Sequence, residues 1–231
     1  MTVPDRVFQK LKTLDTCTAS NAIERLNVRL RNEGFIANTL CCRFQNFEPM
    51  LGYAVTGRIR SANAPMSGRY YYRMDFWRYL ATLPEPRVMV LEDIDGQPGL
   101  GAFVGEMHAV IGRALNCIGY VTNGAVRDLP AVKELGFHLF SGSVSVSHAY
   151  AHLVDFGDPV TIGGLKISPG DLIHGDRHGV QTIPFEHAER IPEEAEKVKC
   201  IESQLKQFCR SPEFSLDGLA EKLKQAAQDC K

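Results

Sequence analysis

Two short apolar segments with an amphipathic segment between them constrain the fold of this chain most. Residues 88–91 and 118–121 are continuous apolar runs, which are typical of strands buried on both faces. Residues 107–115, which lie between them, place apolar side chains at helical spacing. A strand, a helix and a second strand in this order predict a βαβ unit, and with it a parallel sheet and an α/β fold.

The other elements are predicted from periodicity, capping residues and turn signals. We expect a β-rich segment over 138–184, with a two-glycine hairpin in TIGGLKI, and a strand over 53–60. We expect helices over residues 5–15, 69–83, 193–209 and 215–227. Two further helices are expected, one that has Thr18 or Ser20 as its N-cap and extends to residue 26, and one that begins at Asp128 and ends at Gly136. These elements predict a core at residues 1–190 and a helical C-terminal arm at residues 191–231.

The composition narrows the class of protein. The 231 residues are 44% hydrophobic and 23% charged, as in ordinary globular proteins, and a net charge of -1 argues against a dedicated nucleic-acid binder. No apolar run reaches the roughly 20 residues that a membrane span needs. The N-terminus has no apolar leader, and the seven cysteines form no CxxC pair. We therefore expect a cytoplasmic protein with reduced thiols.

A glycine-spaced loop leads into the helix of the βαβ unit. Gly99, Gly101 and Gly105 precede it, and the first turn of a helix has free N–H groups and a partial positive charge. The N–H groups of Met107 and His108 could therefore cradle a carboxylate.

Charged residues follow the second strand of the unit, in NGAVRD. Ligand sites in α/β folds favour the carboxyl ends of strands. Arg127 is a cation suited to a carboxylate or an enolate, and Asp128 is a hard oxygen ligand suited to Mg²⁺. The alternatives are structural: Asp128 could be an N-cap before Pro130, Arg127 could pair with a surface acid, and Glu106 could complement a helix dipole.

Histidines and tyrosines form three further clusters. On a helix, His148 and His152 would share a face; on a strand, His174, Asp176 and His178 would share one. Either spacing could hold a metal, but we favour a polar cluster near a subunit interface, with a turn at 176–179. The third cluster, residues 69–73, combines tyrosines with arginines and could stack on bases, although an amphipathic helix is the favoured interpretation.

The combined pattern resembles the RraA-like superfamily. Glu106 is followed by twenty residues and then by Arg127 and Asp128, which looks like the family's signature. The resemblance covers about residues 12–185, and Asn21 stands where the family usually has an aspartate. The other matching segments are TCTASNAIERL, GYAVTGRIRS, RVMVLEDIDGQPGLGAFVGE and DFGDPVTIGGLKISPGDLIHGDRHGVQTIP.

The resemblance implies a role for each matching residue. Asp128 is expected to be the protein ligand of a Mg²⁺ or Mn²⁺ ion, and Arg127 to bind the 2-oxo acid and stabilise its enolate. Glu106 is expected to order metal-bound water and Arg127. Gly105, Glu106, Met107 and His108 match the segment whose backbone N–H groups hold the substrate carboxylate. A further carboxylate is expected from a neighbouring subunit.

The resemblance also implies a fold and an activity. The fold is an αββα sandwich of the swivelling ββα type, here with a helical C-terminal extension, in a homotrimer or homohexamer. The activity is that of a metal-dependent class II aldolase or decarboxylase, a lyase that cleaves 4-hydroxy-2-oxo diacids or oxaloacetate to pyruvate. The alternatives are a non-catalytic regulator of RNase activity, which tends to lack the aspartate after the arginine, and a sugar-acid dehydratase. No lysine lies between Lys12 and Lys133, which argues against a Schiff-base mechanism.

Overall fold

A mixed sheet forms the body of the molecule. The computed structural model describes residues 2–37, 39–66 and 73–228, and within these ranges nine strands share one sheet. Its order is β1–β6–β5–β3–β2–β10–β11, with β4 paired to β5 and β7 paired to β2. The strands are β1 (Cys41–Cys42), β2 (Met50–Arg60), β3 (Arg87–Asp93), β4 (Ala102–Val104), β5 (Cys117–Val126), β6 (His138–Val144), β7 (His152–Phe156), β10 (Leu172–Asp176) and β11 (Gly179–Ile183).

The predicted βαβ unit is confirmed at the centre of this sheet. β3 and β5 pair in parallel, and α4 (Glu106–Ala114) connects them. β2, β3, β5 and β6 are parallel neighbours, so their carboxyl ends meet at one edge. This is the edge where an α/β fold places its ligand site.

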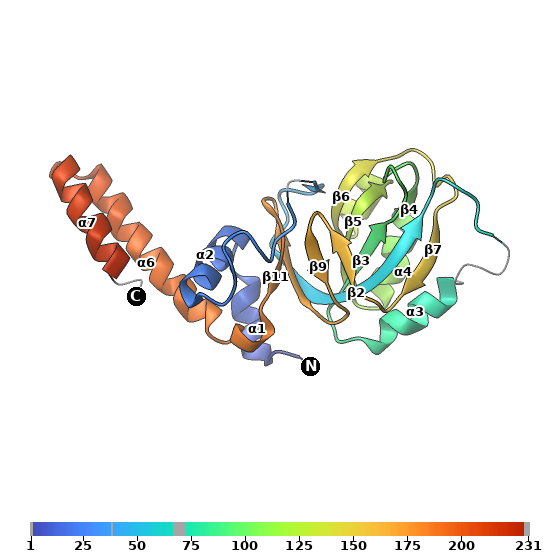
Figure 1. Cartoon of the computed structure of the whole chain (residues 1–231), viewed down its shortest axis with the longest axis horizontal. Helices are drawn as coiled ribbons and strands as arrows, with labels where there is room; N and C mark the ends of the chain where they lie inside the picture. Colours follow the sequence, from blue (N-terminus) through green and yellow to red (C-terminus); the bar gives the residue numbers. More distant parts are fainter. Residues whose placement is uncertain (1, 38, 67–72, 229–231) are drawn as a thin grey trace.

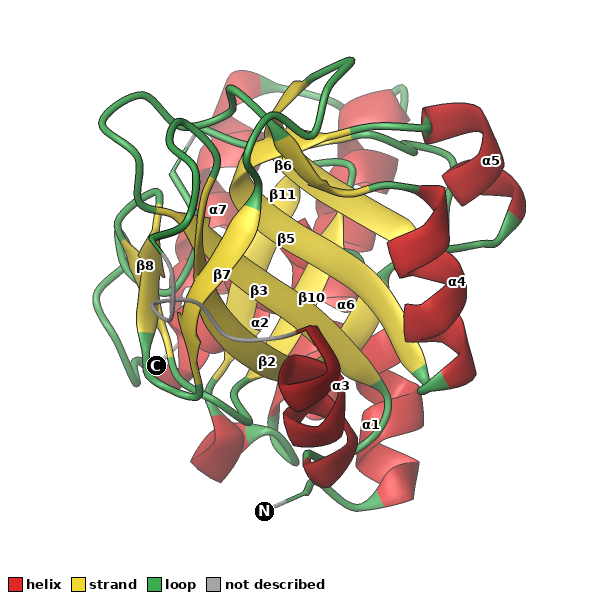
Figure 2. Ribbon diagram, turned by 90° about the vertical axis from the view of Figure 1, so that its right-hand side faces the viewer, coloured by secondary structure: helices red, strands yellow, loops and turns green. Residues whose placement is uncertain are grey.

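Helices cover one face of the sheet, as Figure 2 shows. They are α3 (Arg73–Thr82), α4 and α5 (Leu129–Glu134). Phe76 and Leu80 of α3 pack with Val55 and Tyr120 of the strands in one buried cluster. Full burial of an apolar side chain of this kind contributes about 1.5–3 kcal/mol. Residues 69–72, where we predicted the start of the third helix and the tyrosine cluster, lie outside the described residues.

A separate hairpin packs on the opposite face of the sheet. β8 (Val160–Ile162) and β9 (Leu165–Ile167) are antiparallel, which confirms the hairpin predicted in TIGGLKI. Gly163 and Gly164 have φ values of +52° and +82°. A two-residue hairpin turn of type I′ needs positive φ at both central positions, and glycine adopts it without strain.

The two ends of the chain share a second core. α1 (Asp5–Lys12), α2 (Thr16–Leu26) and the first turns of α6 (Ile191–Arg210) pack together beside β10 and β11, next to the 3-10 turn η1 (Phe185–His187). Arg25 and Glu194 form a half-buried ion pair of 2.9 Å within this group. The fold class predicted from the sequence is therefore confirmed, with the chain ends joined at one end of the sheet.

The start of α2 differs from the prediction. Asp15 is the N-cap, and its carboxylate accepts the Thr18 N–H at 2.8 Å, so a cap at Thr18 or Ser20 is wrong. Asp15 is a more favourable cap than Thr18 or Ser20. Its carboxylate satisfies an N–H group of the first turn and also adds negative charge at the positive end of the helix.

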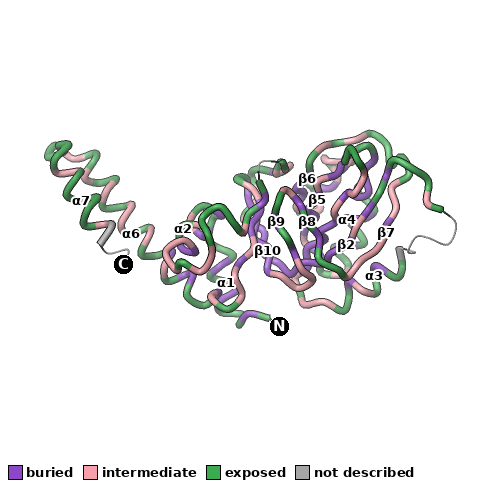
Figure 3. Tube along the Cα trace, in the orientation of Figure 1, coloured by how far each residue is buried: buried purple, intermediate pink, exposed green. Residues whose placement is uncertain are grey.

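The C-terminal helices project from the body, as Figure 1 shows. α6 and α7 (Leu216–Gln228) confirm both predicted helices to within two residues. Figure 3 shows that buried positions on α6 are confined to its start, and α7 has none among its described side chains. The boundary that we placed at residue 190 stays a prediction.

Within the described residues, no helix combines the length and the apolar character needed to cross a membrane. The six described cysteines are free thiols, and Cys230 lies outside the described residues.

Candidate functional site

The Arg127–Asp128 pair lies directly at the carboxyl end of β5. The strand predicted over 118–121 is longer, because β5 continues to Val126. Asn123 permits this extension: its side-chain amide accepts the Asp93 N–H at 2.7 Å and donates to the Asp93 carbonyl at 2.8 Å. The amide thus links β5 to β3 beyond Val90 and Val121, the last residues that pair in the register of these two strands.

Asp128 does not cap its own helix. It occupies the N-cap position of α5 with a left-handed backbone (φ +56°), and its side chain makes no capping hydrogen bond. Instead, Oδ2 accepts the Glu106 N–H at 3.2 Å, and Oδ1 accepts Arg127 Nε at 3.1 Å. A non-glycine residue in this backbone region is strained, and such strain concentrates at functional sites. The structural alternative, in which Asp128 is a simple N-cap, loses its support.

The same contacts fix the charge of Asp128. Partial burial alone would raise its pKa, but the Glu106 N–H, the Arg127 guanidinium and the positive charge of His148 outweigh burial and hold the pKa below its ordinary value. The carboxylate is therefore ionised at neutral pH, which a ligand of a divalent cation requires.

Gly105 makes room for this carboxylate. A Cβ atom at this buried position would collide with Asp128 Oδ2 and would lie 2.9 Å from Arg127 Cγ. The missing side chain, rather than a positive φ, is what the site needs here, since the backbone of Gly105 is extended. A glycine is thus required at this position of the predicted motif, because any side chain would displace the Asp128 carboxylate.

The remaining predicted residues occupy the first turn of α4. The Glu106 side chain is exposed, and within the described part of the chain its carboxylate has no hydrogen bond or ion pair. The Met107 side chain is also exposed, so only its N–H can turn to a ligand in the proposed way. The His108 ring is buried against Phe103 and Trp77, with centroids 5.0 and 6.0 Å away, and its side chain belongs to the core.

A shallow groove runs beside the pair. It has a volume of about 450 Å³ and is lined by residues 127–130 and 144–146. Val146 is 95% exposed on its rim. The groove thus combines a cation, a carboxylate and apolar side chains at the carboxyl edge of the sheet. A larger groove of about 560 Å³ lies between α2 and α6, remote from these residues.

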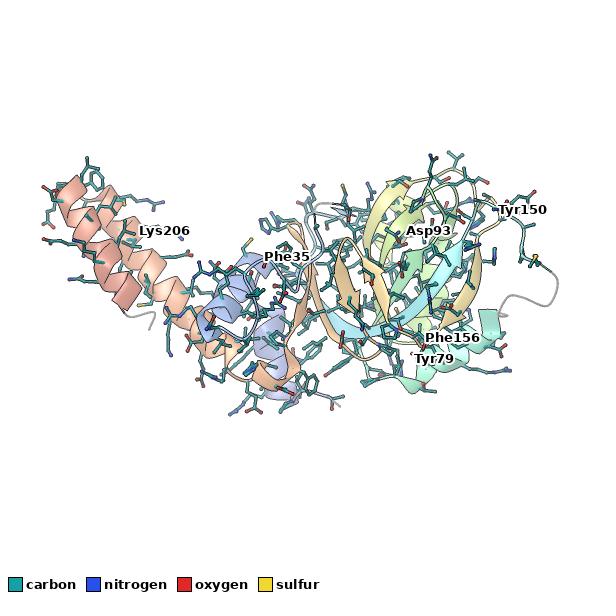
Figure 4. The ribbon with its side chains drawn as sticks, viewed as in Figure 1. Phe35, Tyr79, Asp93, Tyr150, Phe156 and Lys206 are labelled. Atoms are coloured by element: carbon teal, nitrogen blue, oxygen red, sulfur yellow. The ribbon has the colours of Figure 1, made fainter. Side chains whose placement is uncertain are left out.

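Buried polar residues hold the glycine-rich loop in place, and sequence reasoning missed them. Asp93, 2% exposed, accepts the Gly99 N–H at 2.8 Å, and Figure 4 labels it among the strand ends. Burial raises its pKa despite this hydrogen bond. Asp95 accepts the Ser61 N–H at 2.6 Å, and Ser61 Oγ accepts the Gly101 N–H at 3.1 Å. The sequence signal for them is weak, because Ser61 and Gly101 are forty residues apart.

The helical interpretation of His148 and His152 is wrong. His148 lies in a loop, and His152 begins β7, so the two share no helix face. The Ser147 hydroxyl accepts the Ala149 N–H at 2.9 Å, a local contact that is typical of a turn.

The buried members of the second histidine cluster, His174 and Asp176, hold the backbone before and at the start of α2 in place. The His174 ring, fully buried, contacts the Leu14 carbonyl at 2.9 Å. Asp176 accepts the Thr16 N–H and hydroxyl at 2.8 and 2.6 Å, and His178 lies in the turn expected at 176–179. Among the residues that the structure describes, no three His, Cys, Asp or Glu side chains form a metal-binding group.

Asp128 nevertheless fits a weakly held Mg²⁺ or Mn²⁺. Each of its oxygens accepts one hydrogen bond from the described residues, and its side chain is 35% exposed, so lone pairs remain for a cation. Magnesium is commonly held by one or two carboxylates together with waters and substrate oxygens, so one aspartate at a groove suffices.

Known proteins similar to this chain agree with the fold. A protein of Halalkalibacterium halodurans named "Putative 4-hydroxy-4-methyl-2-oxoglutarate aldolase" is 34% identical over 97 residues, which cover 42% of this chain and 46% of that relative. The match thus spans less than half of the relative's length.

Two solved structures are similar over nearly the whole chain. One is an uncharacterized protein from Pseudomonas syringae (TM-score 0.74, 21% identity), which covers 99% of this chain and 96% of its own. The other is Streptomyces coelicolor RraAS2, described as an unusual member of the RNase ES inhibitor RraA protein family (TM-score 0.68, 21% identity), which covers 88% of this chain and 96% of its own. At these identities the similarity shows the fold.

The sequence of this chain also matches the pattern of one protein family, and the match includes the whole candidate site. The RraA-like pattern, described as aldolase/RraA, matches residues 16–181 and so includes both the glycine-rich loop and the Arg127–Asp128 pair. This chain is a member of the RraA-like family.

Proposed function

We propose that this protein is a divalent-metal-dependent lyase that cleaves a 2-oxo diacid to pyruvate. The substrates that we expect are 4-hydroxy-2-oxo diacids, such as 4-hydroxy-4-methyl-2-oxoglutarate, or oxaloacetate. The Asp128 carboxylate carries the proposal: it lines the groove, makes no capping bond to its own helix and is held by the Glu106 N–H and by Arg127. Family membership and the aldolase name of the Halalkalibacterium relative support the class of reaction.

Asp128 would hold Mg²⁺ or Mn²⁺, which supplies a Lewis acid at the 2-oxo group when bound. Arg127 provides a fixed guanidinium that stabilises negative charge as it develops on the enolate oxygen. The first turn of α4, with Gly105 at its N-cap, offers backbone N–H groups to the substrate carboxylate. The exposed Glu106 carboxylate can order water at this end of the groove.

A homo-oligomer, a trimer or a hexamer, would complete the site. Met107, Val110 and Ile111 on α4 and Val144 and Val146 beside the groove are all exposed apolar side chains. An apolar surface around a polar site is typical of an interface. A second copy of the chain would cover it and exclude water from the groove.

The direct test is an assay of pyruvate release from oxaloacetate. We expect release with added Mg²⁺ or Mn²⁺, none after chelation and dialysis, and recovery when the metal is returned. Full turnover in chelator would contradict the metal dependence. Absence of turnover with oxaloacetate and with 4-hydroxy-2-oxo diacids would favour a non-catalytic regulator, and water loss from a sugar acid would favour a dehydratase.

A further inference from the structure

The loop that follows β6 passes over the carboxyl end of β5. We call residues 145–151 the strap. Its Ser145 N–H donates to the Val126 carbonyl at 3.1 Å, and its Ser147 carbonyl accepts the Ala102 N–H at 2.9 Å. Because β6 and β4 both pair with the last residues of β5, they lie on opposite sides of it. The strap therefore crosses the point where the chain leaves β5 for the candidate site.

The strap is firmly attached beyond this crossing. The Tyr150 N–H donates to the Ser61 carbonyl at 3.1 Å, and Figure 4 labels Tyr150 near the edge of the sheet. A Cβ atom at Gly101 would collide with the strap backbone and lie 2.9 Å from Ala149 Cβ. Ala149 has a φ of +44°, a strained conformation that persists only where the surroundings enforce it.

His148 is the titratable side chain that this attachment orients. Its Nδ1 lies 2.6 Å from the Ala102 carbonyl oxygen. A carbonyl oxygen can only accept, so Nδ1 carries the hydrogen and the neutral ring keeps its lone pair on Nε2. The residue is exposed, so Nε2 is accessible to a small molecule.

The His148 ring is also electrostatically coupled to the site. When the ring carries a proton, its charge lowers the pKa of Asp128, as the Glu106 N–H and Arg127 also do. The end of β5, the start of α4 and the strap thus all act on this carboxylate.

We propose that His148 is the proton-transfer residue of this site, with Nε2 as the atom that takes and returns the proton. This inference rests on the proposed lyase function and adds a catalytic residue to it. Orientation by a backbone carbonyl through Nδ1 is the usual way in which a protein fixes the tautomer of a catalytic or ligating histidine.

The proton balance of an aldol cleavage is complete with this residue alone. Nε2 accepts the proton of the substrate's C4 hydroxyl while the C3–C4 bond breaks. The electron pair of the O–H bond forms the carbonyl of the departing oxo acid, and the pair of the C3–C4 bond forms the enolate. The imidazolium then returns the proton to C3, which gives pyruvate and the neutral ring.

Two variants of His148 distinguish proton transfer from a purely structural role, in which the ring would only attach the strap to Ala102. His148→Asn places an amide N–H where Nδ1 lies, so it can keep the bond to Ala102 but has no base at Nε2. We expect kcat for cleavage of a 4-hydroxy-2-oxo diacid, which has the C4 hydroxyl, to fall by about 10²–10⁴, the usual contribution of a general acid–base group. The kcat of His148→Ala should fall by a similar factor. Added imidazole should restore part of it, because the exposed position leaves room for this small base.

His152→Asn is the matched control. Its Nδ1 makes the same kind of contact, 2.6 Å from the Tyr150 carbonyl, but at the start of β7. We expect this variant to retain the wild-type kcat. A similar loss in both variants would overturn the proposal, because a loosened strap would then explain the effect.

A spectroscopic measurement checks the geometry independently of turnover. In a long-range ¹H–¹⁵N spectrum of the neutral ring, the signals of His148, which are identified by their loss in His148→Asn, should show an Nδ1–H tautomer. Adding oxalate with Mg²⁺, as an enolate mimic, should shift the Nε2 signal. An Nε2–H tautomer, or a bound oxalate that leaves this signal unmoved, would overturn the proposal.

The two hypotheses fail in different ways. If the wild-type protein cleaves a 4-hydroxy-2-oxo diacid and His148→Asn cleaves it at the wild-type rate, only the role of His148 is wrong. If the wild-type protein releases no pyruvate from any 2-oxo diacid, the proposed function is wrong, and the role of His148 is wrong with it.

Discussion

Gly105 and Asp128 depend on each other at the residue scale. In Gly105→Ala, the new methyl group would collide with the Asp128 carboxylate and displace it from the Glu106 N–H. We expect kcat/KM for pyruvate release to fall at least about tenfold, since displaced catalytic groups lose rate steeply. Gly96→Ala is the control, because a Cβ atom there meets nothing within 4 Å. Equal activity of the two variants would show that the carboxylate can move without consequence.

Asp128→Asn tests the charge and leaves the shape. Asparagine tolerates the left-handed backbone found here, and Asp128 makes no capping bond that could be lost. We therefore expect the free energy of unfolding to change by no more than about 1 kcal/mol, while activity disappears. Urea unfolding and pyruvate release measure the two effects. A variant that retains activity at saturating Mg²⁺ would argue against Asp128 as the ligand.

Arg127→Lys separates transition-state stabilisation from substrate binding. Lysine keeps the positive charge but loses the planar guanidinium. We expect kcat to fall by about 10²–10³, the typical effect of removing one oxyanion donor, and oxalate to inhibit more weakly. Steady-state kinetics give the result, because an interaction made only in the transition state appears in kcat. A raised KM with an unchanged kcat would make Arg127 a binding residue only.

The sequence predicts those residues whose chemistry is encoded locally. Arg127 and Asp128 directly follow a strand, Gly105 directly precedes a helix, and the structure brings all three together. Asp93 and His148 could not be predicted in the same way. Asp93 accepts an N–H group of an irregular loop, which has no periodic sequence signal, and the Ala102 carbonyl that orients His148 is 46 residues away in sequence.

At the element scale, β6 carries a pH-sensitive position. The His138 ring packs between Phe47 and Phe140. Burial, with the positive charges of Lys12 and Arg113, lowers its pKa to about 4. The unfolded chain takes up this proton near the ordinary value of about 6.5. Between pH 6.5 and 4, the unfolded chain therefore binds this proton more readily than the folded protein does. The contribution of neutral His138 to the free energy of unfolding is fully present above pH 6.5 and is lost as the pH falls toward 4.

His138→Phe keeps a ring in this position and removes the titration. Between pH 7 and 5 we expect the variant to lose about 1 kcal/mol less of its unfolding free energy than the wild type, allowing for a partly exposed ring. Urea unfolding at both pH values measures the difference, since carboxylates titrate alike in the two proteins. Parallel pH profiles would contradict the assignment.

Element boundaries were harder to predict than the elements themselves. The periodicity of 107–115 and of the two C-terminal helices is local, and these helices are confirmed. The length of β5 was underestimated because Asn123 and Gly124 are typical of turns. Here a long-range contact with Asp93 overrides that preference.

At the scale of the whole molecule, the exposed apolar side chains predict assembly. We expect light scattering at micromolar concentration to give a mass three or six times the 25.7 kDa of one chain. Removing residues 199–231 should change this assembly or its solubility and leave the fold intact, because Ala195 and the Arg25–Glu194 pair remain. Circular dichroism controls for the fold. A mass of one chain for the intact protein would contradict the prediction.

The shared core of the two chain ends has a consequence for synthesis on the ribosome. α1 and α2 emerge first, yet their apolar faces pack against α6. About 165 residues separate Leu26 from Ile191, so at roughly 5–20 residues per second the first helices wait on the order of 10–30 s for their partner. During this interval the nascent chain exposes Phe8, Leu11 and Ile23, which are buried in the finished fold. We expect the N-terminal helices to need protection from aggregation, of the kind that a chaperone gives, until α6 has been made.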